Sequence, residues 1–173
     1  LRTYVLFMGD YGAAAPWNDS SVRGCKRFLE RVAGLTDIMT EEPAAKDMEV
    51  KIHKAIKKVS SDIEAMKFNT AIACLMTLIN EIYAVGKISK DDLVIFIKLL
   101  CPFAPHLCEE IWETIGGEGL LSLSQWPEYE ESKTVEDSIE IGVQVNGKVR
   151  GTIVIPNGCA KEEALELAKK DER

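Results

Sequence analysis

Several features that mark particular protein classes are scarce in this 173-residue chain or missing from it. The five cysteines are odd in number and none forms a C-x-x-C pair, which argues against a disulfide framework and favours buried thiols in a reducing compartment. No apolar run approaches the length that spans a bilayer. The first residues, LRTYVLFMGD, lack an initiator methionine and the regions of a signal peptide. We therefore expect a cytoplasmic chain whose first residues continue a helix of a longer protein.

Catalytic and metal-binding motifs are missing as well. No G-x-S-x-G, H-E-x-x-H or P-loop pattern occurs, and GGEG at 116–119 has no preceding strand and no following Lys-Ser/Thr. Cys101, His106 and Cys108 lie close together, but their spacing matches no standard zinc pattern and no second ligand pair is present. We predict no catalytic residue and no metal site in this chain, and we expect these cysteines to pack in the core.

The net charge of −7 argues against a general nucleic-acid binder, but the charge is unevenly distributed. Residues 109–140 contain ten acidic residues and one lysine, whereas residues 23–31 contain four cations and one glutamate. Arg23, Arg27 and Arg31 recur every four residues, so they share one helix face. They could track phosphates or form a solvated surface, and both alternatives stay open. For KIHKAIKK at 51–58 we favour a solvated helix surface.

The hydrophobic periodicity predicts mostly helix. We expect helices over about residues 2–8, 20–38, 46–65, 69–85, 89–101, 105–115 and 160–170. Asn18, Asp19 or Ser20 would cap the second helix, Asn69 the fourth and Ser89 the fifth. The three tryptophans could stack on nucleic-acid bases, but their apolar or proline-flanked settings favour packing. They are Trp17, Trp112 and Trp126.

A strand–turn–strand pattern, SIEIGVQVNGKVRGTIVIP, follows an acidic extended segment. A two-residue Asn-Gly loop would pair Val145 with Lys148 and mix charged and apolar side chains on one face. A three-residue loop, 146–148, pairs Val145 with Val149 and places the bulky apolar residues on one face. We therefore predict the longer loop, with Lys148 at the tip and Arg150 on the outer face.

The order of several segments resembles a known family. They are LRTYVLFMGD, WNDSSVRG at 17–24, KRFLERV at 26–32, HKAIKKVSSDIEAMKFNTAIACLM at 53–76, PFAPHLCEEIW at 102–112, QWPEY at 125–129 and VQVNGKVRG at 143–151. Together they are similar to the C-terminal part of bacterial-type leucyl-tRNA synthetases, which are class I enzymes. The PFAPH–EEIW segment is shared with the valine and isoleucine enzymes, whereas the combination of FNTAI, PFAPH, WP and VQVNGKVRG selects leucine.

The resemblance implies a mainly α fold, a helix bundle of the class I anticodon-binding type followed by a truncated β-hairpin and a helix. Residues 1–118 would form the helical anticodon-binding domain, residues 119–137 a linker, and residues 138–173 a partial C-terminal tRNA-binding domain. The parent enzyme would attach leucine to its tRNA with ATP and Mg²⁺. Its catalytic and editing sites would lie outside this chain, which would need no cofactor of its own.

The expected partner is leucine tRNA, and we expect a monomer with no DNA or membrane partner. Arg23, Arg27 and Arg31 would contact the tRNA backbone, and Lys148 and Arg150 would make a separate contact. These cations would neutralise and position phosphates rather than read bases. Two alternatives stay open: the same region of a valyl- or isoleucyl-tRNA synthetase, or a helical protein-interaction scaffold without an RNA role.

Overall fold

The computed structural model describes residues 1–9, 12, 15–43, 45–134, 138–145 and 148–156. The chain divides into two compact units, Leu1–Thr134 and Val135–Arg173. In the second unit the description covers the backbone of one hairpin. The helix predicted over residues 160–170 lies outside the described residues.

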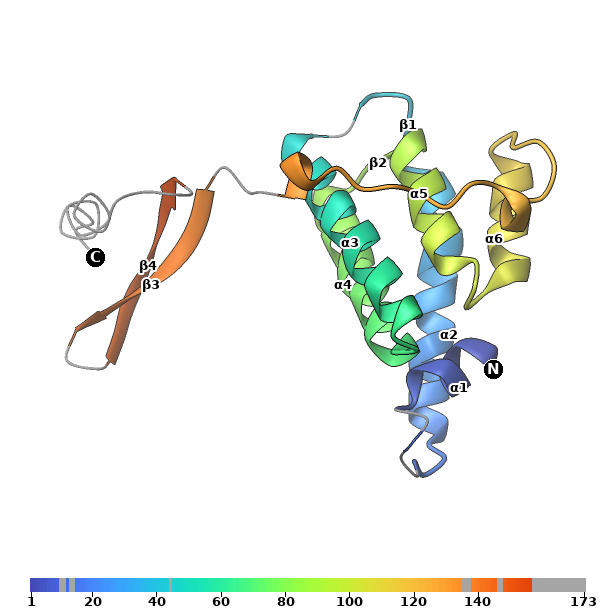
Figure 1. The fold of residues 1–173 in the computed structure, drawn as a ribbon, viewed down its shortest axis with the longest axis horizontal. Helices are drawn as coiled ribbons and strands as arrows, with labels where there is room; N and C mark the ends of the chain where they lie inside the picture. Colours follow the sequence, from blue (N-terminus) through green and yellow to red (C-terminus); the bar gives the residue numbers. More distant parts are fainter. Residues whose placement is uncertain (10–11, 13–14, 44, 135–137, 146–147, 157–173) are drawn as a thin grey trace. The chain divides into compact units, whose positions relative to one another are not determined.

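The first unit is a bundle of helices (Figure 1), which confirms the predicted fold class. Its elements are α1 (Arg2–Phe7), α2 (Asp19–Ala33), η1 (Gly34–Ile38), β1 (Met39–Thr40), α3 (Lys46–Glu64), α4 (Phe68–Val85), β2 (Ile88–Ser89), α5 (Lys90–Leu100), α6 (Pro105–Thr114), η2 (Leu121–Leu123) and η3 (Glu131–Thr134). The η elements are 3₁₀ turns, so the helix predicted to run to residue 38 ends in a tighter turn after residue 33.

Two helices begin where the sequence predicts capping side chains. The Asn18 side-chain oxygen accepts hydrogen bonds from the backbone N–H groups of Ser20 (2.9 Å) and Ser21 (3.2 Å) at the start of α2. The Ser89 hydroxyl accepts one from the Asp92 N–H at 3.1 Å at the start of α5. Each cap satisfies donors that the first helical turn leaves without intrahelical partners.

The cap predicted for α4 is wrong. Asn69 lies inside the helix, which begins at Phe68 with Lys67 in the capping position and no side-chain cap. The other end of α4 is conventional, because Gly86 takes φ = +77°. That left-handed conformation suits a residue without a Cβ and is a common way for a helix to end.

Helix α4 is also the most apolar of the longer α-helices described. Its 18 residues have a mean hydropathy of 1.4, so by length and composition alone the helix could cross a membrane. The expectation that no apolar run approaches this length is therefore wrong. One third of these residues are buried inside the bundle, and they face its core: Ala71, Ile72, Leu75, Leu78, Ile79 and Ile82. A core helix of a globular bundle also satisfies this criterion of length and hydropathy.

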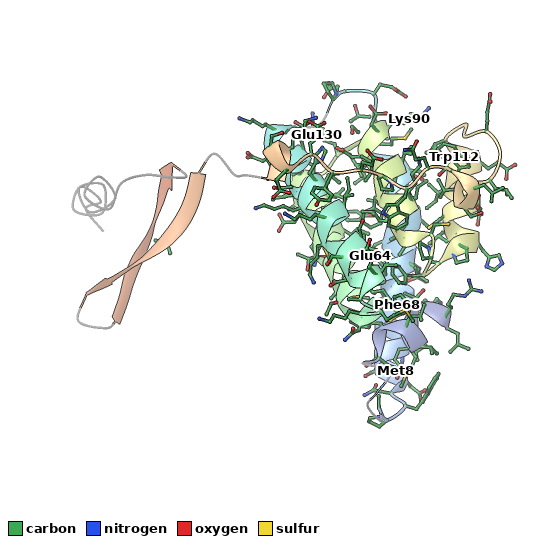
Figure 2. All side chains as sticks on the ribbon, viewed as in Figure 1. Met8, Glu64, Phe68, Lys90, Trp112 and Glu130 are labelled. Atoms are coloured by element: carbon green, nitrogen blue, oxygen red, sulfur yellow. The ribbon has the colours of Figure 1, made fainter. Side chains whose placement is uncertain are left out.

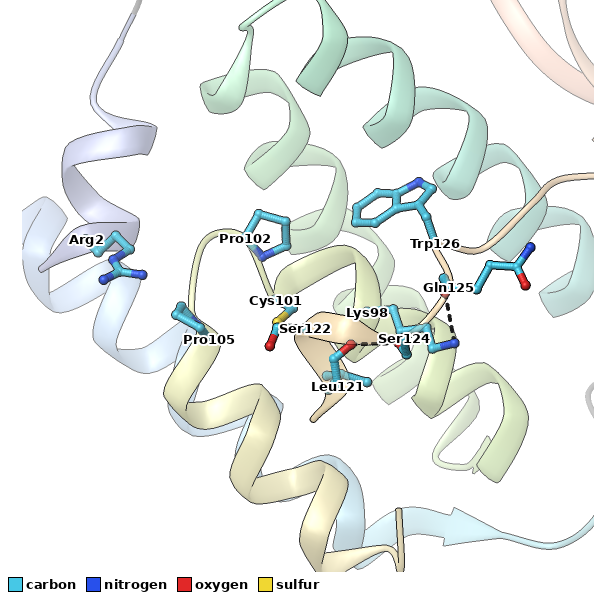
Figure 3. A pocket seen from close by; sticks show the side chains of 10 residues that line it. All are labelled: Arg2, Lys98, Cys101, Pro102, Pro105, Leu121, Ser122, Ser124, Gln125 and Trp126. Carbon is cyan, nitrogen blue, oxygen red and sulfur yellow. Dashed lines mark hydrogen bonds between the residues drawn. The ribbon is translucent and has the colours of Figure 1, made fainter. Parts of the chain in front are cut away.

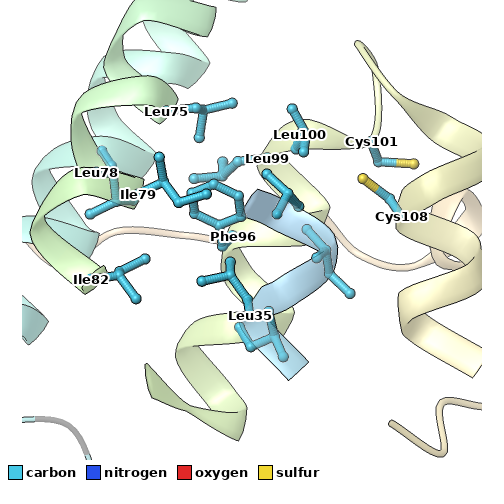
Figure 4. Close-up of a cluster of buried hydrophobic side chains, with 14 of the residues drawn as sticks. Leu35, Leu75, Leu78, Ile79, Ile82, Phe96, Leu99, Leu100, Cys101 and Cys108 are labelled. Carbon is cyan, nitrogen blue, oxygen red and sulfur yellow. The ribbon is translucent and has the colours of Figure 1, made fainter. Parts of the chain in front are cut away.

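The core lies between α4, α5 and the helices packed around them. Leu75 and Ile79 of α4 meet Phe96 of α5 in its middle, and all three are fully buried (Figure 4). Burying each side chain of this size contributes roughly 1.5–3 kcal/mol. Cys101 and Cys108, at the α5–α6 corner, point toward one another, and burial raises the pKa of both thiols. They therefore pack as small apolar groups.

A small parallel sheet of two strands, each two residues long, joins distant parts of the first unit. Met39 of β1 pairs with Ile88 of β2, and Thr40 pairs with Ser89. The sequence does not predict these strands, because two residues are too few to display an alternating pattern. The pairing connects the turn after α2 to the start of α5.

The segment after α6 packs along the bundle, although we predicted a linker there. The Trp126 indole N–H donates to the Ser60 hydroxyl at 2.8 Å, and the Glu130 backbone N–H donates to His53 Nδ1 at 3.0 Å. The segment crosses the bundle past α5 in Figure 1, and Figure 2 labels Glu130 near its end. Residues 121–134 therefore belong to the first unit.

The second unit contains an antiparallel hairpin of β3 (Ser138–Val145) and β4 (Lys148–Pro156). Ile141 pairs with Ile153 as predicted, but the three-residue loop is wrong: Val145 pairs with Lys148. The register shifts between Gln144 and Val143, and Arg150 is the residue left over on β4. A β-bulge of this kind reconciles a two-residue Asn-Gly connection with the apolar pairing at the base.

Candidate nucleic-acid interface

Helix α2 places the predicted arginine stripe on the surface of the first unit. Cys25, Phe28 and Val32 bury the opposite face of this helix in the bundle. Arg23 and Arg27 are exposed. Like charges four residues apart on a helix repel by about 0.2–0.5 kcal/mol per pair, so their spacing costs a little stability and leaves two guanidinium groups open to an anionic partner.

Arg31, the third member of the stripe, has a different environment. Its Nη1 donates to the Asn80 side-chain oxygen at 2.7 Å, and its guanidinium lies over the Tyr83 ring, 4.7 Å from the centroid. The Tyr83 hydroxyl in turn donates to the Arg31 carbonyl at 2.8 Å. Arg31 is half-buried and fastens α2 to α4, so the structure separates it from Arg23 and Arg27.

The lysine-rich face of α3 is largely neutralised by acidic neighbours. Lys51 lies 2.6 Å from Glu81, and Lys58 lies 2.6 Å from Asp62. Lys57 contacts Glu131 at 2.7 Å, and this contact raises the pKa of the lysine. These pairs favour the solvated helix surface that we expected over a phosphate-tracking stripe.

For the two cations of the hairpin, the structure describes the backbone positions. Lys148 is the first residue of β4 and pairs with Val145, while Arg150 is the bulged residue. A β-bulge bends the strand locally, and β-bulges are enriched beside functional sites. The structure therefore places the two cations on one short strand, in a unit separate from the α2 stripe.

A pocket in the first unit is lined by two cations that no sequence pattern singles out. Arg2 of α1 and Lys98 of α5 line it together with Trp126, and its volume is about 370 Å³ (Figure 3). Arg2 and Lys98 are isolated cations within apolar helices, so they form no pattern along the chain. Trp126 belongs to the QWPEY segment and is 38% exposed; its indole N–H anchors the segment to Ser60 at 2.8 Å.

The chemistry available in the described part of the first unit is recognition of anions. Exposed guanidinium groups form strong, charge-assisted hydrogen bonds with phosphate oxygens. Among the described residues, no group of three or more histidine, cysteine, aspartate or glutamate side chains could hold a metal ion. The arrangement suits phosphate contacts along an RNA backbone.

Comparison with known proteins also indicates contact with RNA. Residues 45–165 match the family model described as the anticodon-binding domain of tRNA ligase. Leucine--tRNA ligases are similar over almost the whole chain: that of Alkaliphilus oremlandii is 42% identical over 174 residues, covering 100% of this chain, and that of Bdellovibrio bacteriovorus is 43% identical over 175 residues, covering 98%. The chain spans 22% of the length of each of these relatives.

A solved structure agrees with these relatives. The crystal structure of a ternary complex of Agrobacterium radiobacter LeuRS with tRNA and LeuAMS matches with a TM-score of 0.80 and 31% identity, covering 99% of this chain and 25% of that one. The resemblance to leucyl-tRNA synthetases found in the sequence is thus confirmed. The family match, the relatives and the helical fold agree, and the chain belongs to the anticodon-binding domain family of tRNA ligases.

Proposed function

We propose that this chain is the tRNA-binding part of a leucine--tRNA ligase, and that it holds and orients leucine tRNA while the rest of the enzyme performs the chemistry. The whole enzyme would attach leucine to tRNA in the cytoplasm with ATP and Mg²⁺. The chain itself would act as a monomer without a cofactor, with RNA rather than DNA or a membrane as its partner.

One observation carries the proposal. The leucine enzymes match this chain from end to end, and the structure that it resembles at a TM-score of 0.80 is a complex with tRNA. The sequence combination that selects leucine over valine and isoleucine includes VQVNGKVRG at 143–151. The relatives named above are all leucine enzymes, which favours leucine tRNA within the class.

The contacts follow from the charges described above. Arg23 and Arg27 would contact phosphates of the tRNA backbone, because both are exposed on one face of α2. Arg31 would contribute less to tRNA affinity than these two, since Asn80 and Tyr83 already engage it. Lys148 and Arg150 would form the separate contact of the second unit.

The test is tRNA affinity measured by filter binding with the full-length parent enzyme. Arg23→Gln and Arg27→Gln together should weaken the binding of leucine tRNA. Lys87→Gln serves as the matched control, because Lys87 is an exposed lysine paired with Glu42 at 2.6 Å. The arginine contact is wrong if the double variant binds as tightly as the control.

Specificity is tested by aminoacylation with the same enzyme. Leucine should be attached to leucine tRNA in preference to valine or isoleucine on their tRNAs. A parent that charges valine or isoleucine tRNA instead would identify the alternative enzyme. A parent that neither binds nor charges any tRNA would overturn the proposal and favour a protein-interaction scaffold.

A further inference from the structure

The pocket lined by Arg2, Lys98 and Trp126 has features of a ligand site that the proposed contacts do not use. It lies between α1, the α5–α6 corner and the segment around η2 (Figure 3). Its volume of about 370 Å³ falls within the roughly 300–1,000 Å³ range of small-molecule sites. A pocket of this size can hold a group as large as one nucleotide.

Two prolines and a tryptophan form apolar walls of the pocket. Pro102 and Pro105 flank the corner between α5 and α6, and the proline ring fixes the backbone angle φ at each. Trp126 is held by its indole N–H, which donates to Ser60 at 2.8 Å, while 38% of the residue stays exposed. A tryptophan whose N–H is already satisfied and whose ring is partly exposed can offer its face for stacking.

The charge of the lining is positive. Arg2 and Lys98 are among the ten lining residues, and none of the ten carries a carboxylate. The Lys98 ammonium donates one hydrogen bond to the Gln125 carbonyl at 3.1 Å, which leaves two of its three donors for a ligand. In a chain of net charge −7, two cations without a lining carboxylate form a local anion site.

An acidic group bonded to two residues of the pocket lining, Glu109, is already engaged. Glu109 accepts hydrogen bonds from the backbone N–H groups of Leu121 (2.7 Å) and Ser122 (2.9 Å), and these bonds lower the pKa of its carboxyl. The carboxylate thereby fixes the backbone of η2, which supplies the serine side of the pocket. Ser122 and Ser124 add hydroxyl groups to the lining.

We propose that this pocket binds one unstacked nucleotide of an RNA strand, with the base against Trp126 and the flanking phosphates near Arg2 and Lys98. Stacking on an aromatic face together with charge neutralisation is how single-stranded RNA is commonly held. The combination fits a nucleotide better than a purely apolar ligand, which would not use the two cations. The inference rests on the proposed function, because it names a site within the tRNA contact.

The test uses the whole 173-residue chain and two small probes. Adenosine 3′,5′-bisphosphate carries a base and both flanking phosphates, whereas adenosine carries the base alone. The indole N–H resonances of the three tryptophans are followed by NMR during titration. The bisphosphate should shift the Trp126 resonance and leave Trp17 and Trp112 unchanged, and adenosine should bind more weakly than the bisphosphate.

Variants separate the contributions. Lys98→Gln should weaken the bisphosphate roughly two- to fivefold, as expected for one exposed charge contact, whereas Lys90→Gln on the same helix should have no effect. Trp126→Ala, followed through the backbone amides of residues 121–125, should weaken it more than about fivefold. Trp126→Phe should retain most of the affinity, because phenylalanine keeps a stacking face without the hydrogen bond to Ser60.

Three results would overturn the pocket assignment. They are equal binding of adenosine and the bisphosphate, equal effects of Lys98→Gln and Lys90→Gln, and shifts centred on Trp17. If tRNA affinity of the chain depends on Arg27 but not on Lys98 or Trp126, the pocket fails and the proposed function stands. If the chain binds the bisphosphate but no tRNA, the proposed function fails and the RNA assignment fails with it.

Discussion

Arg27 and Arg31 lie one helical turn apart on α2, yet their surroundings give them different roles. Arg27 is exposed, while Arg31 bonds Asn80 at 2.7 Å and lies over the Tyr83 ring. These partners are 49 and 52 residues away along the chain. The spacing of four residues could therefore predict the shared face, but it could not predict which arginine the fold itself engages.

This difference predicts that the two substitutions change stability by different amounts. Arg31→Ala should lower the free energy of unfolding by about 1–2 kcal/mol, because it removes a cation–π contact and a hydrogen bond. Arg27→Ala should change the same quantity by less than about 0.5 kcal/mol. Urea unfolding followed by tryptophan fluorescence measures both, since all three tryptophans lie in the first unit. Equal losses would contradict the assigned roles.

Asp92 gives the first unit a pH dependence of unusual sign. The residue is 7% exposed, and its Oδ2 has no hydrogen-bond partner among the described residues. Burial raises the pKa of its carboxyl, the nearby charges of Asp91 and Glu49 raise it further, and the Ser89 hydrogen bond and His53 oppose the rise. The folded state therefore holds this proton more tightly than the unfolded chain does.

The sign follows by linkage. The contribution of Asp92 to stability is largest below the ordinary aspartate pKa of 3.8 and is lost as the pH rises through the higher folded-state value. Asp92→Asn removes this loss, so the variant should gain stability relative to the parent chain as the pH rises above 3.8. Urea unfolding at several pH values measures the difference, and a difference independent of pH would contradict the prediction.

At the scale of elements, backbone conformation decides what a glycine does. Gly86 ends α4 at φ = +77°, whereas Gly24 lies within α2, and a Cβ added there would meet nothing within 4 Å. Alanine is strained in the first setting and is the best helix former in the second. The two glycines therefore form a matched pair.

Gly86→Ala should lower the free energy of unfolding by about 1–2 kcal/mol, and Gly24→Ala should raise it by roughly 0.5–1 kcal/mol. Thermal unfolding followed by circular dichroism should show melting temperatures shifted in opposite directions. A shift in the same direction for both variants would contradict the assigned roles of backbone conformation at Gly86 and Gly24.

Elements with a strong local signal were predictable from the sequence. Asn18 and Ser89 cap helices as expected, because a side-chain oxygen before an apolar period identifies a helix start. The two-residue β1–β2 sheet and the packing of residues 121–134 carry no such signal. Both depend on partners distant in the chain, such as Met39 with Ile88 and Trp126 with Ser60.

For the whole molecule, a net charge of −7 means that RNA binding must rely on local cations. Each phosphate contact releases counterions, so the logarithm of the affinity falls linearly with the logarithm of salt concentration. Lys148→Gln and Arg150→Gln together should reduce this slope by about 1.4–1.8, or about 0.7–0.9 per contact. Filter binding of leucine tRNA across a salt series measures the slope, and an unchanged slope would remove the hairpin from the interface.

Of the candidate interface, the sequence predicted the α2 stripe and the hairpin cations but missed the pocket of Arg2, Lys98 and Trp126. Three elements distant in the chain form that pocket, and no single segment carries its pattern. The family resemblance was recoverable because it depends on ordered local motifs. The pocket depends on how those motifs pack against one another.

The bulge at Arg150 divides the hairpin ladder into two sections. One section contains apolar pairs such as Ile141 with Ile153, and the other contains the pairs Gln144 with Val149 and Val145 with Lys148. A gain or loss of one residue at the tip can be absorbed at the bulge without moving the strands below into another register. A length change between the strands could thus leave the register of the pairs from Ser138 with Pro156 to Ile141 with Ile153 unchanged.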